Sequence, residues 1–170
     1  GVAGTGYVTE SGREGDRRLH AFEVSSGRAL WSVDPATLDR KLEGCSVRGE
    51  PVVSEGMLVV PMRRNSSVRR VSGALLAGID LWSGELRWVR PLCSVGVPAF
   101  SRAARTAERA IAFEGVVYRT DSLGVVSAVE AETGRPVWVR RTSPPTDMRA
   151  FSAFSLQSPN QPWAASQPSR

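Results

Sequence analysis

The 170-residue sequence contains very little lysine, histidine and cysteine. Lys41 is the only lysine and His20 the only histidine, so a Ser/His/Asp triad would have a single possible base. His20 alternates with apolar residues, which favours a structural role. Cys45 and Cys93 are too few for a disulfide scaffold and lack metal-ligand spacing. They are either paired in an oxidising compartment or two separate thiols.

Long apolar runs are also missing, because none approaches the roughly 18 residues that a membrane span requires. Residues 1–6 contain no basic leader, no apolar stretch and no initiator Met, so we expect that the N-terminus has been cut. The hydrophobic fraction of 41% and the charged fraction of 23% are typical of a globular domain. The length is that of one domain with a real core.

The charge is skewed toward arginine. The net charge is +5, from 22 basic and 17 acidic residues, and all basic residues except Lys41 are arginines. Arginine suits planar, bidentate recognition of carboxylates and phosphates, which allows for an anionic partner. A coding bias toward arginine explains the same composition, and the two explanations stay open here.

An eleven-residue pattern occurs three times, at 21–31, 78–88 and 128–138. Each copy has a small residue first, an acid third, a hydroxyl sixth, Gly seventh and Trp eleventh. Four of these positions give the candidate structural motif: Ala21, Glu23, Gly27 and Trp31; Gly78, Asp80, Gly84 and Trp88; Ala128, Glu130, Gly134 and Trp138. The copies are about 50 to 60 residues apart, which fits one four-stranded propeller blade with its loops.

Each copy is typical of a β-hairpin. Its second and fourth positions are apolar, as on a strand with one face toward a core. The Ser/Thr-Gly pair makes the turn, and the acid is placed to accept hydrogen bonds from the turn's hydroxyl or amides. The Trp stands opposite a small residue, so we expect it to lie over a small residue of a neighbouring blade.

Further hairpins precede the copies. Tight Glu-Gly turns at 55–56 and 114–115 each separate two apolar runs. The expected strands outside the motif are Tyr7–Glu10, Pro51–Ser54, Met57–Met62, Ala110–Phe113 and Val116–Thr120. Together with the motif hairpins they predict eleven strands, three in the first blade and four in each of the others. The expected blades cover about 1–48, 49–107 and 108–141.

The motif closely resembles the tryptophan-docking motif of the pyrroloquinoline quinone (PQQ) repeat, found in quinoprotein dehydrogenases and their non-enzymatic propeller relatives. The resemblance covers roughly residues 6–141. It departs from the family pattern at Gly78, where Ala is usual, and at Glu23 and Glu130, where Asp is usual. It implies an all-β protein, a β-propeller of four-stranded antiparallel blades with about three blades present. Family members usually close with about seven or eight blades. We therefore expect a partial propeller that needs further blades or subunits, with the Ser/Pro/Gln-rich 142–170 a loop or tail leading onward.

Loop lengths separate the two ends of the expected blades. The turns between the first and second strands and between the third and fourth are tight, whereas the other connections are long and carry arginines. Long loops on a rigid scaffold are common binding sites. The candidate binding face consists of Arg17, Arg18, Arg63, Arg64, Arg69, Arg70, Arg102 and Arg105. These arginines either bind an anionic or acidic partner or form a solvated basic rim. Asp121 is either a solvated turn residue or a cation ligand.

The resemblance allows two classes of function. One is a non-catalytic scaffold that binds a protein or anionic ligand on the long-loop face. The alternative is a fragment of a PQQ-dependent dehydrogenase that uses PQQ and calcium. The family's catalytic members carry a vicinal Cys-Cys pair, whereas Cys45 and Cys93 are far apart, so we favour the scaffold and predict no catalytic residue, metal or cofactor here. Nucleic acid is not an expected partner, and the family implies an extracytoplasmic location.

Overall fold

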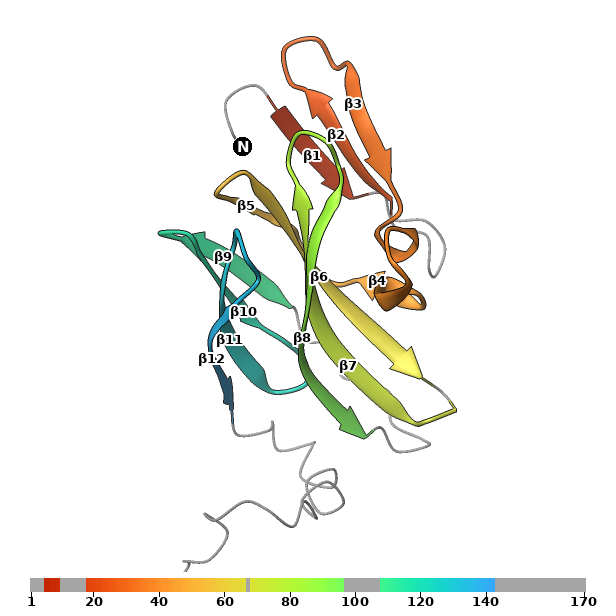
Figure 1. Ribbon diagram of the computed structural model, residues 1–170, viewed down its shortest axis with the longest axis vertical. Helices are drawn as coiled ribbons and strands as arrows, with labels where there is room; N and C mark the ends of the chain where they lie inside the picture. Colours follow the sequence, from red (N-terminus) through yellow and green to blue (C-terminus); the bar gives the residue numbers. More distant parts are fainter. Residues whose placement is uncertain (1–4, 10–17, 67, 97–107, 143–170) are drawn as a thin grey trace, which may run out of the picture.

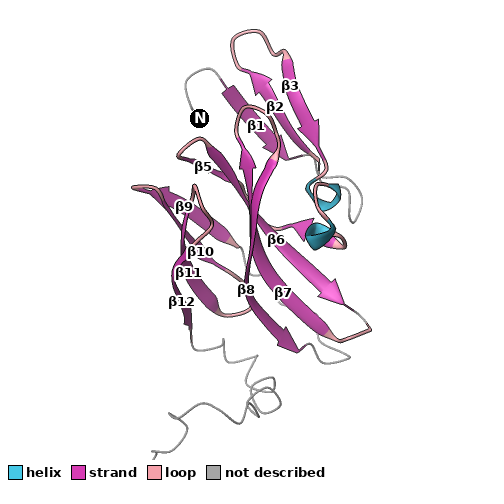
Figure 2. Cartoon of the chain, in the orientation of Figure 1, coloured by secondary structure: helices cyan, strands magenta, loops and turns pink. Residues whose placement is uncertain are grey.

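The computed structural model describes residues 5–9, 18–66, 68–96 and 108–142. Within these ranges the chain forms twelve strands, two short 3-10 helices and no α-helix (Figure 2). Every strand pairing is antiparallel, and the strands make three separate sheets that follow one another along the chain. The expectation of an all-β chain is therefore confirmed.

The first sheet contains β1 (Thr5–Thr9), β2 (Leu19–Glu23) and β3 (Ala29–Val33), in that order. It is followed by two 3-10 turns, η1 (Pro35–Thr37) and η2 (Arg40–Leu42). An aspartate caps each turn: the carboxylate of Asp34 accepts from the Ala36 amide at 2.9 Å, and that of Asp39 from the Lys41 amide at 2.6 Å.

The second sheet has five strands, one more than expected. It contains β4 (Cys45–Val47), β5 (Val52–Ser54), β6 (Met57–Ser66), β7 (Val71–Asp80) and β8 (Leu86–Gly96). The long strand β6 pairs with β5 along its first part and with β4 along its last. Residues 45–47 thus belong to the second sheet, although the expected boundary near 48 assigned them to the first. A three-residue strand is too short to show alternation in the sequence.

The third sheet contains β9 (Arg109–Phe113), β10 (Val116–Thr120), β11 (Val125–Glu130) and β12 (Pro136–Arg141). Its order is β12-β11-β10-β9, the four-stranded meander that was expected. Pro136 begins the edge strand β12, where the N–H that proline lacks is not needed for a hydrogen bond of the ladder.

The second sheet lies between the other two (Figure 1). One hydrophobic core joins it to the first sheet, where Leu58, Leu75 and Ile79 pack with Leu19. A second core joins it to the third sheet, where Met57, Val59 and Leu76 pack with Val117 and Val129. Strands of the central sheet are consequently apolar on both faces, and β6 reads as the continuous apolar run from Met57 to Met62.

Tight turns lie at one end of the sheets, shown uppermost in Figure 1. The turns at 55–56 and 114–115 place Glu and then Gly at positive φ, with Glu55 and Glu114 both at 49°. Two successive positive φ values are the pattern of a type I′ hairpin turn. The connections at the opposite end join β6 to β7 and β10 to β11. We call this the long-connection end, because the sequence predicted the long loops there.

Candidate functional site

The structure places four of the eight arginines of the candidate binding face on exposed surface. Arg18 is exposed just before β2, Arg64 is exposed on β6, and Arg69 and Arg70 are exposed in the turn between β6 and β7. Arg17, Arg102 and Arg105 lie outside the described residues. The expected long loop before the second motif is shorter than predicted, because β6 continues to Ser66 and β7 begins at Val71.

Arg63 does not belong to this exposed set. Strand β6 runs through it in register with Ser46 and Ala74, and only 5% of the residue is exposed. Alternation along β6 turns Arg64 outward and Arg63 inward, toward the third sheet. The prediction that Arg63 lies on the binding face is therefore wrong.

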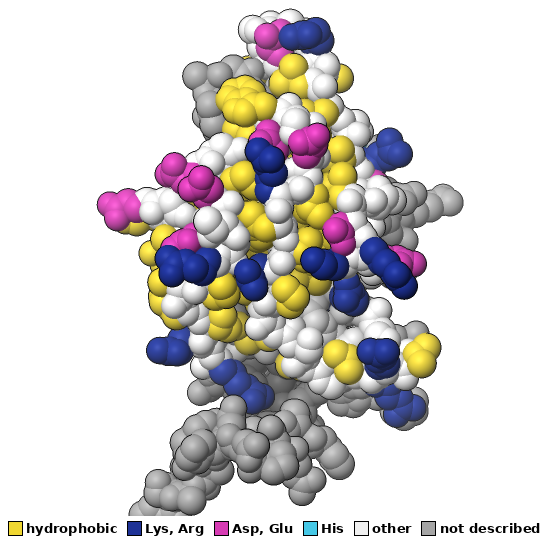
Figure 3. All heavy atoms as spheres, in the orientation of Figure 1, with side chains coloured by type: hydrophobic (Ala, Val, Ile, Leu, Met, Phe, Trp, Pro, Cys, Tyr) yellow, Lys and Arg dark blue, Asp and Glu magenta, His cyan; other side chains and the backbone are white. Residues whose placement is uncertain are grey.

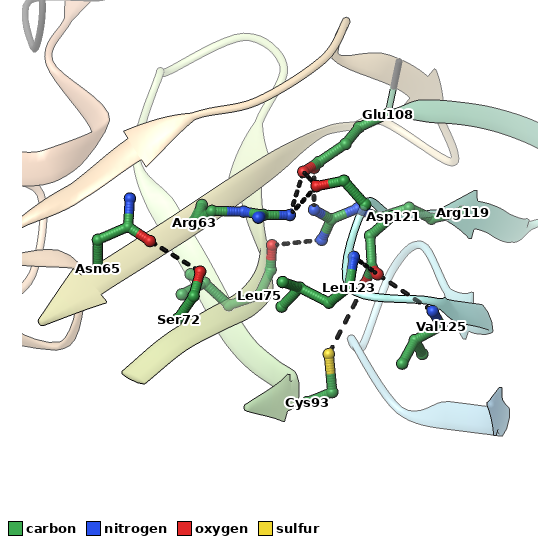
Figure 4. Close-up of polar contacts among 11 residues, drawn as sticks. Arg63, Asn65, Ser72, Leu75, Cys93, Glu108, Arg119, Asp121, Leu123 and Val125 are labelled. Atoms are coloured by element: carbon green, nitrogen blue, oxygen red, sulfur yellow. Dashed lines mark hydrogen bonds and ion pairs between the residues drawn. The ribbon is translucent and has the colours of Figure 1, made fainter. Parts of the chain in front are cut away.

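Arg63 instead takes part in a buried cluster that joins the second and third sheets, shown in Figure 4. Glu108, just before β9, accepts from Arg63 through Oε1 and from Arg119 on β10 through Oε2, the latter at 2.6 Å. Ser122 donates to Glu108 Oε1 at 3.0 Å and accepts from Arg63 at 2.7 Å. Arg119 also donates to the Leu75 carbonyl at 2.9 Å. We call these four side chains the Glu108 network.

The Glu108 network is almost fully removed from solvent. The exposed fraction of the side chain is 1% for Arg119 and 6% for both Arg63 and Glu108. Two guanidinium groups share one carboxylate within the network, and the Asp121 carboxylate lies beside it (Figure 4). Within the described residues, the Nε atoms of Arg63 and Arg119 make no hydrogen bond. Because desolvated charges depend on their partners, Glu108 is essential to this part of the interface.

Asp121 and Cys93 lie beside the network (Figure 4). Asp121 Oδ1 accepts from the amides of Leu123 at 2.8 Å and Val125 at 3.2 Å, and Oδ2 lies 3.7 Å from the Cys93 thiol. Burial, followed by the charge of Asp121, raises the pKa of Cys93 to about 11. Cys45 and Cys93 are both free thiols.

Asp121 closes the turn between β10 and β11, because its carboxylate is engaged by backbone amides. Among the described residues, no group of three or more His, Cys, Asp or Glu side chains could hold a metal ion. No such cluster of side chains therefore supports the cation-binding alternative for Asp121 in the part of the chain that the structure describes.

Sequence reasoning missed other exposed arginines near the long-connection end. Arg109 begins β9, and Arg140 and Arg141 end β12. The strand directions could have indicated these arginines. In a four-stranded meander, the first strand begins and the fourth strand ends at this same end of the sheet. Among the side chains drawn in colour in the lower part of Figure 3, the charged ones are Lys and Arg.

The motif tryptophans lie at the junctions between sheets. Trp31 Nε1 donates to the Leu81 carbonyl of the second sheet at 3.1 Å, and Trp88 Nε1 donates to the Ala131 carbonyl of the third at 3.0 Å. Each indole also covers the motif glycine of the next sheet. A Cβ placed on Gly84 would lie 3.0 Å from Trp31, and one on Gly134 would lie 2.5 Å from Trp88.

The motif acids hold their turns, as the sequence suggested. Asp80 accepts from the amides of Trp82 and Ser83, both at 3.0 Å, and Glu130 accepts from the Thr133 hydroxyl at 2.8 Å. The two backbone amides, Ser83 first, hold the pKa of Asp80 below its usual value of 3.8. The hydrogen bond from Arg135 lowers the pKa of Glu130.

Comparison with known families gave a match over residues 2–165, to the family model described as outer membrane protein assembly factor BamB. A search of curated proteins found no match. Among the described residues, no helix has the length and apolarity needed to cross a membrane.

Similar solved structures include BamB from Moraxella catarrhalis, with 21% identity and a TM-score of 0.55 over 81% of this chain. A quinohemoprotein alcohol dehydrogenase from Pseudomonas putida HK5 has 21% identity and a TM-score of 0.55 over 83% of this chain. The corresponding enzyme from Comamonas testosteroni has 18% identity and a TM-score of 0.54 over 83%. The chain spans 33% of that BamB and 25% and 26% of the two enzymes. These similarities show the propeller fold, and we call each sheet a blade.

Proposed function

Because the chain belongs to the PQQ-repeat family whose model is described as outer membrane protein assembly factor BamB, we propose that it is part of a non-catalytic β-propeller scaffold. Its long-connection end binds an acidic segment of a protein partner. Arg18, Arg64, Arg69 and Arg70 are the contact residues. An extracytoplasmic location is part of the same proposal and is supported by the family description.

The observation that carries the proposal is the clustering of exposed arginines on the hairpin of β6 and β7. Ten paired residues on each strand make this hairpin rigid, and the exposed Arg69 and Arg70 lie in its turn. Arg64 is exposed on the adjoining strand, and its guanidinium donates to the Lys41 carbonyl. A rigid hairpin presents its charged groups without a large loss of backbone entropy on binding.

The Glu108 network holds this hairpin against the third sheet, because Arg63 on β6 is bonded to Glu108. An acidic partner would thus meet exposed guanidinium groups on a hairpin whose position is fixed by buried contacts. Such complementarity increases association rates and specificity more than it increases affinity.

The dehydrogenase alternative has less support. Its structural relatives share the fold at 18% to 21% identity, which carries no catalytic residue over to this chain. Cys45 on β4 and Cys93 on β8 are separate free thiols. We include no cofactor in the proposed function.

The test compares binding of a fluorescein-labelled ten-residue polyglutamate peptide to two charge-reversal variants by fluorescence anisotropy. The first variant carries Arg64→Glu, Arg69→Glu and Arg70→Glu. The control carries Arg28→Glu, Arg87→Glu and Arg135→Glu, which change the net charge equally and affect side chains that are 69%, 58% and 74% exposed. These three arginines lie at the tight turns of the opposite end.

We expect the first variant to bind the peptide at least about tenfold more weakly and the control to bind within about twofold of the wild type. Binding of the wild type should weaken with added salt. Equal losses of peptide binding in both variants would mean that only net charge matters. Absence of peptide binding by the wild type would contradict the proposal directly. Either result would overturn the proposal.

A further inference from the structure

An exposed apolar residue, Val68, lies in the turn between β6 and β7. Its exposed fraction of 94% is the highest among the large apolar side chains that the structure describes, and the next highest is 65%, at Ile111. Ile111 alternates with Ala110 and Ala112, which pack against the second blade, so it lies on the face of the third blade that turns away from it. The second blade has a blade on each side, so the exposure of Val68 does not result from a missing neighbour.

The hairpin of β6 and β7 is longer than its counterpart in the third blade. Its strands pair over ten residues each, whereas β10 and β11 pair over five. Five further residues lengthen a strand by about 16 Å, at about 3.3 Å per residue. We define the tip of this hairpin as Val68, Arg69 and Arg70, and all three residues are exposed. In Figure 1 the tip lies at the lower right, away from the strands of the third blade.

A hydrogen bond and the backbone geometry give the tip a defined shape. The Ser66 hydroxyl accepts from the amide of Arg69 at 3.2 Å, across the turn. Arg70 has a φ of 48°, in the left-handed region where glycine fits with less strain than any other residue. An arginine at this position puts a second guanidinium group at the tip despite that strain. The exposed Val68 is thus followed by two charged residues in a fixed turn.

The sheet face that carries Arg64 continues toward the tip through small and apolar residues. Arg64 is in register with Gly73, and the next row on the same face joins Val71 to Gly96 on β8. Among the described residues, a Cβ placed on Gly96 would have no atom within 4 Å beyond its own chain neighbours, so this part of the face is open. The half-buried Val71 and the exposed Val68 thus form a small apolar area bordered by exposed arginines.

We propose that the acidic segment of the partner also carries large apolar side chains, which bind Val68 and Val71; this rests on the function proposed above. Arg64, Arg69 and Arg70 then pair with its carboxylates around the apolar contact. An entirely acidic segment fits this surface less well, because a carboxylate against a valine loses water without gaining a hydrogen bond. An apolar centre with a polar rim is the usual arrangement of protein interfaces.

The experiment compares two fluorescein-labelled peptides of equal length and charge, (Glu-Glu-Leu)4 and (Glu-Glu-Ser)4, by fluorescence anisotropy. We expect the wild type to bind the leucine peptide at least about tenfold more tightly than the serine peptide. Val68→Ser should reduce this preference to less than about threefold and leave binding of the serine peptide within about twofold of the wild type. Partial unfolding of a variant would weaken the binding of both peptides equally, so it cannot produce this change in the ratio of affinities.

Val137→Ser is the matched control, because it makes the same substitution at a valine that is 53% exposed on β12. This control should keep the preference for the leucine peptide. A preference that is absent from the wild type, that persists in Val68→Ser, or that falls equally in both variants would overturn the proposal. Binding to phosphatidylglycerol vesicles that depends on Val68, without a preference for the leucine peptide, would assign the tip to an anionic lipid surface and would overturn it as well.

The serine peptide separates a failure of the apolar contact from a failure of the proposed function. The combined variant Arg64→Glu, Arg69→Glu and Arg70→Glu should bind the serine peptide at least about tenfold more weakly than the wild type. If it does and the wild type shows no preference for leucine, the arginines bind an acidic segment and the apolar contact is refuted. If the wild type binds neither peptide, the proposed function fails and the apolar contact fails with it.

Discussion

Replacement of Trp88 by Ala tests whether the motif tryptophans hold the blades together. The indole lies against Gly78 of its own blade and Gly134 of the next, where an added Cβ would come within 2.2 Å and 2.5 Å of it. The substitution leaves a space between the backbones at Gly78 and Gly134, and this space can close only if one of these backbones moves. Because Trp88 is only partly buried, we expect a loss at the lower end of the range for Trp→Ala changes, about 3 kcal/mol.

Part of that loss comes from one hydrogen bond. Trp88 Nε1 donates to the Ala131 carbonyl at 3.0 Å, and removal of the donor leaves that carbonyl without its partner. This contribution is about 1 kcal/mol, with the remainder coming from lost packing. Trp88→Phe keeps an aromatic ring and removes the donor, so it should cost less than Trp88→Ala.

The assay is equilibrium urea unfolding followed by far-UV circular dichroism, since tryptophan fluorescence changes with the substitution itself. Trp82→Ala is the matched control, because Trp82 is 60% exposed in the turn of the same blade. The control should lose less than about 1 kcal/mol. A loss below about 1 kcal/mol for Trp88→Ala, or equal losses for both variants, would refute the docking argument.

Two further predictions concern carboxylates. Glu108→Gln leaves the buried Arg63 and Arg119 without their shared carboxylate and should lower the free energy of unfolding by about 3 kcal/mol or more, measured by urea unfolding; Arg135→Gln, which is at the surface, should cost no more than about 1 kcal/mol, and a similar loss in both would contradict the reasoning. The pKa of Asp80 is lowered in the folded protein, so its contribution to stability is present above the usual value of 3.8 and is lost as the pH falls through the folded pKa. Asp80→Asn should flatten the fall in stability between about pH 5 and pH 2, and an unchanged slope would count against this origin.

The repeated features of the fold could be predicted from the sequence. The Glu-Gly turn identified β9 and β10 within one residue, and the motif hairpin located the turn between β11 and β12, since alternation and turn chemistry are local. Asp80 and Glu130 bond to their own turns, as their position before the Ser/Thr-Gly pair indicated. These features need only a few neighbouring residues and recur in each blade.

The extension of β6 could not be predicted in the same way. The polar run Arg63 to Ser66 is typical of a loop when read alone, yet all four residues pair with β7. Arg63 is buried because Glu108, 45 residues later, supplies its carboxylate. The described residues of the other blades have no equivalent of this pairing, so internal repetition gave no signal for it.

This difference separates the two kinds of contact between blades. Trp31 and Trp88 dock through motif positions that each blade repeats, and the contacts therefore specify the stacking of blades in general. Among the described residues, the Glu108 network joins only the second and third blades, and it lies toward the long-connection end. A junction held by unrepeated charges can fix one pair of blades in one arrangement, since a different blade would leave Arg63 and Arg119 buried without a carboxylate. The exposed Arg64, Arg69 and Arg70 are built on the same hairpin, so the network also fixes the position of the arginines that we propose bind the partner.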